Sequence, residues 1–90
     1  MKYKLRYSKK AKKTLDSYGK DVRERLEEEF IGLLLFLEGK ESMNPDVKFL
    51  KGKYQGLYCL RIGKYRAIFC IEPYEQAILI IDINSRGDIY

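Results

Sequence analysis

The chain has 90 residues and a formal net charge of +5, with no histidine and only two cysteines. This length suffices for one modest core, so we expect a single domain spanning residues 1–90. The lack of histidine removes the commonest general base and the commonest metal ligand. Metal-ligand spacings and Gly-rich phosphate loops are also missing from the sequence, so we expect no metal and no cofactor. The positive charge indicates an acidic partner such as RNA, DNA or an acidic polypeptide.

The first half of the chain predicts a strand followed by two helices. Residues 2–7 alternate basic and apolar side chains, as in a strand with one apolar face. Ser8 is a candidate N-cap for a helix over residues 9–18. A second helix, over residues 21–37, carries apolar side chains at three- and four-residue spacing.

The second half of the chain predicts antiparallel strands. These strands are expected at residues 47–50, 57–62, 65–72 and 76–83. The order of a strand, two helices and then three or four antiparallel strands is that of an α+β domain. We therefore expect a helical hairpin packed on one face of a twisted sheet.

A tight turn joins two of these strands. Gly63 and Lys64 fit the two-residue loop of a type II′ hairpin, which would place Arg61 directly opposite Arg66. Opposed like charges are destabilising. Either the two long side chains spread into water, or an anion lies between them.

The two faces of this hairpin differ in character. One face would pack under the helices: Tyr58, Leu60, Ile62, Tyr65, Ala67, Phe69 and Ile71. The opposite face holds both arginines together with Leu57, Cys59, Ile68 and Cys70. We interpret the cysteines as buried small hydrophobic residues and not as a disulfide. Because the helices cover only one face, the second apolar face predicts a partner, either another protein or a second copy of the chain.

Arginine, lysine and tyrosine on one sheet suit cleavage of RNA. In that reaction the 2′-hydroxyl attacks the adjacent phosphate, and the protein stabilises the charge that develops there. Arginine offers a planar, permanently charged fork, and lysine or tyrosine can move protons where nearby cations lower the pKa. Arg86 and Tyr90 follow the last strand, although a terminal tyrosine can also pack and Arg86 can also pair with Asp88.

Three motifs resemble the RelE/ParE superfamily of bacterial and archaeal toxins. They are an L-x-G turn at Leu50–Gly52, an L-R-x-G-x-Y-R hairpin at Leu60–Arg66, and an R-x-x-[IV]-Y ending at Arg86–Tyr90. The opening strand and lysine-rich helix are also similar, so the resemblance covers almost the whole chain. It implies a RelE-like, microbial RNase-like fold and a RelB-like antitoxin as the partner in a hetero-oligomer.

The resemblance also implies roles for individual residues. In the RelE branch the toxin cleaves messenger RNA in the ribosomal A site by 2′-hydroxyl attack without a metal. By this match Arg66 would stabilise the transition state, Arg86 would contact phosphate, and Tyr90 would stack on a base or assist proton transfer. The expected catalytic set is completed by Arg61 and Lys53, and the expected RNA-binding residues are Lys48, Lys51, Lys64, Lys9 and Lys10.

The chain departs from the best-known RelE-type enzymes in its supply of proton-transfer groups. Leu57 and Cys59 occupy positions where those enzymes place lysines, and no histidine precedes the terminal tyrosine. The ParE branch shares the fold but acts on DNA gyrase, and this alternative stays open. The longest apolar run, residues 30–37, is too short to span a membrane, so we expect a cytoplasmic protein that meets the ribosome and messenger RNA but no membrane.

Overall fold

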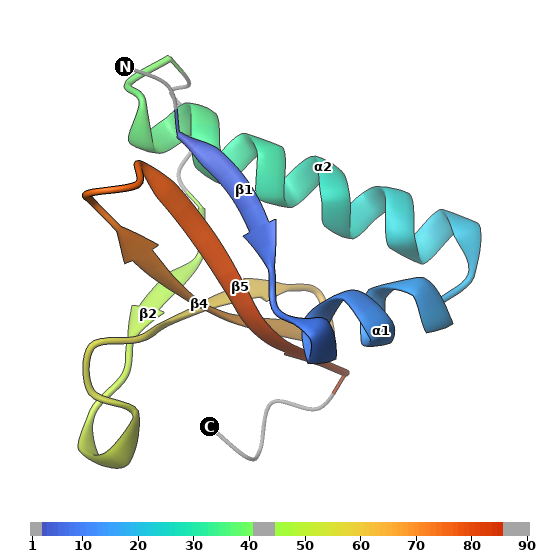
Figure 1. The fold of residues 1–90 in the computed structure, drawn as a ribbon. Coiled ribbons are helices and arrows are strands. Elements are labelled where there is room, and N and C mark those ends of the chain that lie inside the picture. The colour runs from blue at the N-terminus through green and yellow to red at the C-terminus, as the bar shows by residue number, and fades with distance from the viewer. Residues whose placement is uncertain (1–2, 41–44, 86–90) are drawn as a thin grey trace.

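The computed structural model describes residues 3–40 and 45–85, and within them it has an α+β fold with one five-stranded mixed sheet (Figure 1). The strand order is β1-β5-β4-β3-β2. The elements are β1 (Lys4–Tyr7), α1 (Lys9–Ser17), α2 (Lys20–Leu37), β2 (Val47–Phe49), the 3₁₀ helix η1 (Gly52–Tyr54), β3 (Tyr58–Ile62), β4 (Tyr65–Glu72) and β5 (Ala77–Asn84). The predicted fold class is confirmed, with element ends that differ from the prediction by a residue or so.

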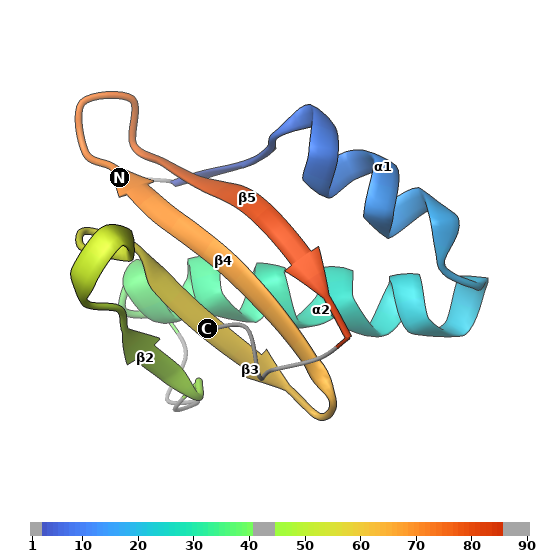
Figure 2. The same ribbon diagram turned by 90° about the horizontal axis from the view of Figure 1, so that it is seen from below.

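The main core lies between the two helices and one face of the sheet. Ala11 and Leu15 of α1 and Leu26 and Phe30 of α2 are fully buried against that face. Figure 2 shows α2 running behind the strands, with the opposite face of the sheet turned toward the viewer. The hairpin residues predicted to pack under the helices do so: Leu60, Ile62, Tyr65, Ala67 and Phe69 are buried, and Tyr58 and Ile71 are partly buried.

Ser8 sets both the start of α1 and its attachment to the sheet. Its Oγ accepts a hydrogen bond from the backbone N–H of Ala11 at 3.0 Å, which is the predicted N-cap. The same hydroxyl donates to the backbone carbonyl of Ile81 at 2.6 Å. One side chain therefore satisfies the helix end and joins it to β5.

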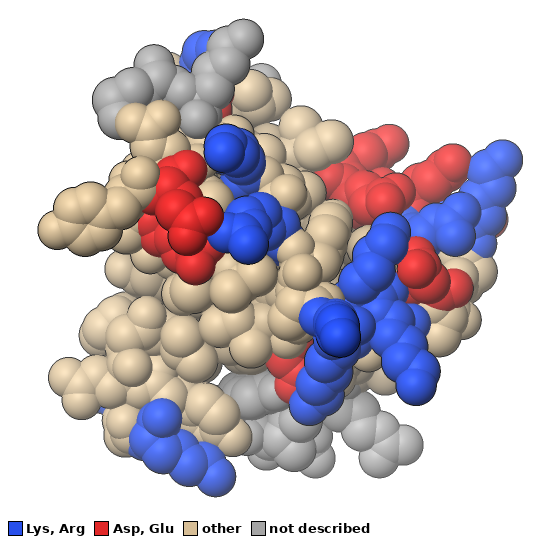
Figure 3. Space-filling model, in the orientation of Figure 1, with Lys and Arg blue, Asp and Glu red and all other residues tan. Residues whose placement is uncertain are grey.

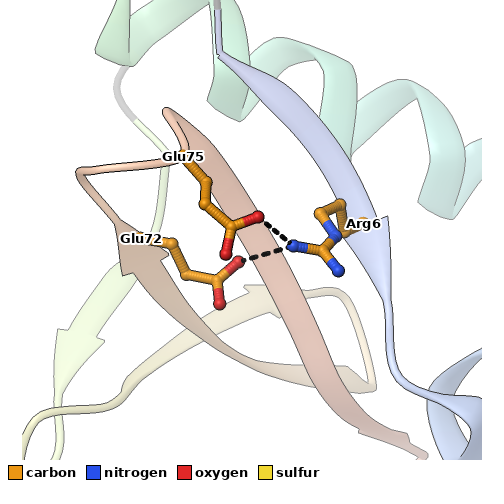
Figure 4. A network of polar contacts seen from close by, with 3 residues as sticks. All are labelled: Arg6, Glu72 and Glu75. Atoms are coloured by element: carbon orange, nitrogen blue, oxygen red, sulfur yellow. Dashed lines mark hydrogen bonds and ion pairs between the residues drawn. The ribbon is translucent and has the colours of Figure 1, made fainter.

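The N-terminal strand is a member of the main sheet, which raises the strand count above the prediction. β1 pairs in parallel with β5, whereas β2 to β5 form the predicted antiparallel part. Beyond the backbone ladder, Arg6 Nη1 donates to Glu75 Oε1 at 2.6 Å and to Glu72 Oε1 at 3.4 Å (Figure 4). Arg6 thus joins the edge strand β1 to the turn between β4 and β5.

A smaller apolar cluster covers part of the other sheet face. Leu50 packs there with the buried side chains of Cys59 and Ile68, and Tyr54 of η1 packs against them. The prediction that this face needs an external partner is therefore wrong for Cys59 and Ile68, because the chain itself covers them. Both cysteines are free, as expected, but Cys70 is only partly buried.

Candidate functional site

The β3–β4 turn has the predicted geometry. Gly63 has a φ of 59°, and Lys64 is not among the described residues with positive φ, as a type II′ turn requires. Ile62 pairs with Tyr65, and Arg61 lies directly opposite Arg66. Two guanidinium groups are therefore held by adjacent strands on the sheet face away from the helices.

Arg61 has a carboxylate partner that the sequence did not suggest. Its Nε donates to Asp46 Oδ2 at 2.9 Å, and its backbone N–H donates to the Asp46 carbonyl at 2.9 Å. Asp46 directly precedes β2, and the Val47–Leu60 pairing carries it to the level of Arg61. Both side chains are about half exposed, so the ion pair contributes on the order of 0–1 kcal/mol.

Arg66 lacks such a carboxylate within the described residues. Its Nη1 donates to the backbone carbonyls of Gly63 at 3.3 Å and Tyr65 at 3.2 Å. No ion pair joins it to an Asp or Glu in residues 3–40 or 45–85. Within these residues, no carboxylate neutralises the positive charge of Arg66.

Lys48 joins the two arginines around Cys59. The β2–β3 register pairs Lys48 with Cys59, and the charges of Arg66, Arg61 and Lys48 all act on the Cys59 thiol. Burial raises the pKa of that thiol, and the three cations offset only part of the effect. Cys59 is therefore a protonated thiol at neutral pH, and the three basic groups form the charged part of the site.

The other predicted lysines of this part of the chain lie apart from the two arginines. Lys64 Nζ is 5.5 Å from the ring centroid of Tyr65, a residue of the helix-side core, so Lys64 leans away from the arginines. Lys53 Nζ lies 5.2 Å from the ring centroid of Tyr54, and Lys51 precedes η1. These two lysines precede β3, whereas Arg61 lies near the end of β3 and Arg66 near the start of β4.

Lys9 and Lys10 belong to a separate basic region on α1, where Figure 3 shows Lys and Arg side chains gathered. Lys9 lines a groove of about 630 Å³ between β1 and α1. Lys10 Nζ lies 3.4 Å from Asp82 Oδ2 on β5. Two residues further along β5, Asn84 is the cross-strand neighbour of Arg66. The α1 region and the arginine hairpin therefore lie on the two sides of β5.

A third guanidinium, Arg25 of α2, lies against the hairpin turn. A β-carbon built on Gly63 would lie 3.0 Å from Arg25 Nη2. Sequence reasoning missed this contact because it joins a helix to a turn far along the chain. Sequence reasoning also missed the contact of Asp46 with Arg61. If the predicted strand at residues 47–50 is paired antiparallel with the next strand and extended backward by one residue, Asp46 lies opposite Arg61.

The described residues offer few candidates for a general base. Burial and, to a lesser degree, Glu27 raise the pKa of Tyr7 to about 12, and burial also raises the pKa of Tyr18. Neither tyrosine therefore ionises near neutral pH. Arg86 and Tyr90, the other expected site residues, lie outside the described residues. Within the described part of the chain no cluster of His, Cys, Asp or Glu is arranged to hold a metal ion.

A family model described as the ParE toxin of the type II toxin-antitoxin system, parDE, matches residues 5–90. The chain belongs to the RelE/ParE toxin superfamily. It is a toxin of a type II toxin–antitoxin system. The resemblance inferred from the three motifs is thereby confirmed.

Solved structures with the same fold include toxins and toxin–antitoxin complexes. The RelBE2 complex from Mycobacterium tuberculosis is 21% identical, with a TM-score of 0.75, over 96% of this toxin and 100% of that chain. The RelE–RelB complex from Pyrococcus horikoshii is 31% identical, with a TM-score of 0.71, over 97% of this toxin and 98% of that chain. Isolated RelE from Escherichia coli is 18% identical, with a TM-score of 0.69, over 94% of this toxin and 85% of that chain. A search of curated protein sequences found no significant match.

No helix in the described part of the toxin is both long enough and apolar enough to cross a membrane.

Proposed function

We propose that this toxin is a ribosome-dependent endoribonuclease that cleaves messenger RNA in the A site by metal-independent 2′-hydroxyl attack. The observation that carries the proposal is the position of Arg66: it faces Arg61, shares a sheet face with Lys48, and has no carboxylate partner among the described residues. The 31% identity to the toxin chain of an archaeal RelE–RelB complex supports a RelE-type activity.

The cleavage step needs positive charge more than any other protein contribution. The 2′-oxygen attacks phosphorus, the bond to the 5′-oxygen breaks, and the products are a 2′,3′-cyclic phosphate and a 5′-hydroxyl. Negative charge accumulates on the non-bridging oxygens, and a planar guanidinium such as that of Arg66 can donate two hydrogen bonds to them. Arg61 and Lys48 add positive potential beside it.

We assign the remaining catalytic roles to Arg86 and Tyr90 near the C-terminus and to Lys53. Arg86 would contact phosphate, Tyr90 would stack on a base or move a proton, and Lys53 would complete the catalytic set. Lys48, Lys51, Lys64, Lys9 and Lys10 would contact the RNA. Because Cys59 keeps its proton, naked RNA should be cut slowly, and the ribosome should supply the orientation that makes attack efficient.

A RelB-like antitoxin is the proposed partner of the free toxin. The similar structures from M. tuberculosis and P. horikoshii are both toxin–antitoxin complexes. By analogy, an antitoxin would bind this toxin in a hetero-oligomer and cover the exposed cations of the site. The free toxin would act in the cytoplasm, where ribosomes and messenger RNA are found.

Inhibition of DNA gyrase is the second candidate function. The matching family model is that of ParE, and a YoeB/ParE toxin from Agrobacterium tumefaciens shares the fold at 15% identity and a TM-score of 0.69, over 93% of this toxin and 99% of that chain. A gyrase inhibitor requires a binding surface but no exposed arginine arranged for phosphate. We therefore rank it below RNA cleavage.

A paired assay separates the two candidates. The purified toxin is added to a defined translation reaction, and message ends are mapped by primer extension; the same preparation is added to a gyrase supercoiling reaction. The proposal expects cuts at the A site and normal supercoiling. Intact messages together with inhibited supercoiling would move the function to gyrase.

A further inference from the structure

Asp46 and Arg61 form an ion pair beside the β3–β4 hairpin, on the arginine face of the sheet. The side chain of Arg61 is held at its Nε edge, 2.9 Å from Asp46 Oδ2, and its backbone N–H is held separately by the Asp46 carbonyl. No other side-chain bond to Arg61 occurs in residues 3–40 and 45–85. The carboxylate therefore occupies the Nε edge of the guanidinium, where it competes with any other oxygen anion for Arg61.

The pair reduces the repulsion between Arg61 and Arg66, which lie directly opposite each other. An oxygen anion on Arg61 is the interaction that an RNA phosphate would also make. Both partners are about half exposed, so solvent screens their attraction and a phosphate can replace the carboxylate. The backbone bond from Arg61 to Asp46 does not depend on the carboxylate, so β2 stays paired with β3 when the side chains separate.

We propose that Asp46 is a built-in competitor for RNA phosphate at the Arg61–Arg66 hairpin. In the free toxin its carboxylate holds Arg61 and lowers the positive potential; when RNA binds, phosphate takes its place. This inference rests on the proposed function, because it assumes that RNA binds at the arginine face. Asp46 thereby limits the affinity of the site for RNA without contacting the reacting atoms.

The test is a binding assay with a single-stranded 2′-O-methyl RNA oligonucleotide, which lacks the attacking hydroxyl and stays uncut. Fluorescence anisotropy compares wild type, Asp46→Asn, Arg61→Ala and the double variant. Glu28→Gln, an exposed position on α2, is the control for the same change in net charge. Far-UV circular dichroism and urea midpoints check that every variant is folded.

Asp46→Asn should tighten binding about fivefold, since the attraction between Asp46 and Arg61 that a phosphate must displace is about 1 kcal/mol even in water. Glu28→Gln should change binding by much less. In the Arg61→Ala background the gain from Asp46→Asn should disappear, because the carboxylate acts through Arg61.

Equal effects of Asp46→Asn and Glu28→Gln would overturn the inference, as would a gain that persists without Arg61. An Arg66→Ala variant separates this failure from a failure of the proposed function. If Arg66→Ala weakens RNA binding while Asp46→Asn does not tighten it, the competitor role alone is wrong. If Arg66→Ala leaves RNA binding intact, or if the wild-type toxin does not bind the oligonucleotide at low salt, both the site and the inference are wrong.

Discussion

Arg61 and Arg66 are alike in the sequence and differ in their surroundings. Arg61 is held by Asp46 from the segment before β2, whereas Arg66, among the residues that the structure describes, donates to the carbonyls of its own turn and to no carboxylate. A guanidinium without a carboxylate partner is better placed to receive a developing negative charge, because no ion pair must break first. This difference is the reason that Arg66 carries the transition-state role in our account.

Gly63 holds the turn that places both arginines. Replacing it with alanine should lower the free energy of unfolding by about 1–2 kcal/mol, because φ is +59° and the new β-carbon would meet Arg25 Nη2 at 3.0 Å. Urea unfolding measures the loss. In an Arg25→Ala background the part due to the contact should vanish while the part due to φ remains; no destabilisation in either background would contradict this account of the turn.

Tyr7 should make the toxin less stable in alkali. Its pKa is raised from 10.0 to about 12 in the fold, so its contribution is fully present below pH 10 and is lost as the pH rises through about 12. Unfolding midpoints measured across this window should fall less steeply for Tyr7→Phe than for wild type. Tyr74→Phe, at a fully exposed position, is the control and should follow wild type.

At the scale of elements, the attachment of α1 depends on one hydroxyl. Ser8→Ala should cost about 1–2 kcal/mol of unfolding free energy, because the helix loses its N-cap and the Ile81 carbonyl loses its donor. Ser17→Ala, at the exposed end of the same helix, should cost less than about 0.5 kcal/mol. Equal losses for the two variants, measured by urea unfolding, would contradict the assigned role of Ser8.

Local patterns predict the elements that local forces determine. The β3–β4 register followed from Gly63 and Lys64, and the start of α1 followed from Ser8, because each signal lies within a few residues of its effect. The parallel pairing of β1 with β5 could not be predicted in this way. It joins segments about 70 residues apart, and the alternation in residues 2–7 fits an edge strand in either direction.

The same limit applies to the site. Arg61 and Arg66 were found because one hairpin carries both. Asp46 was missed because its place depends on the register of a three-residue strand, and Arg25 because its contact with Gly63 crosses from helix to turn. The cover that Leu50 provides over Cys59 was missed for the same reason.

The acidic side chains Glu24, Glu27, Glu28 and Glu29 all belong to α2, which also carries Arg23 and Arg25, whereas α1 and the β3–β4 hairpin are rich in lysine and arginine. Figure 3 shows basic and acidic side chains close together on one face of the toxin. With a net charge of +5, RNA binding should weaken steeply as salt rises. Arg66→Ala should reduce the slope of log affinity against log salt by about one unit, and Arg23→Ala on α2 should leave it unchanged; the reverse would contradict the proposed binding face.

The most direct test of the account measures how fast the Arg66→Ala variant of the toxin cleaves a message bound to programmed ribosomes. The Arg23→Ala variant is the matched control. Primer extension measures the rate at which the A-site cut appears. We expect Arg66→Ala to be slower than wild type by at least about 100-fold, as when one preorganised donor to a developing charge is removed, and Arg23→Ala to cut normally. Cleavage by Arg66→Ala at the wild-type rate would contradict the central claim, because the charge on the phosphate would then be stabilised elsewhere.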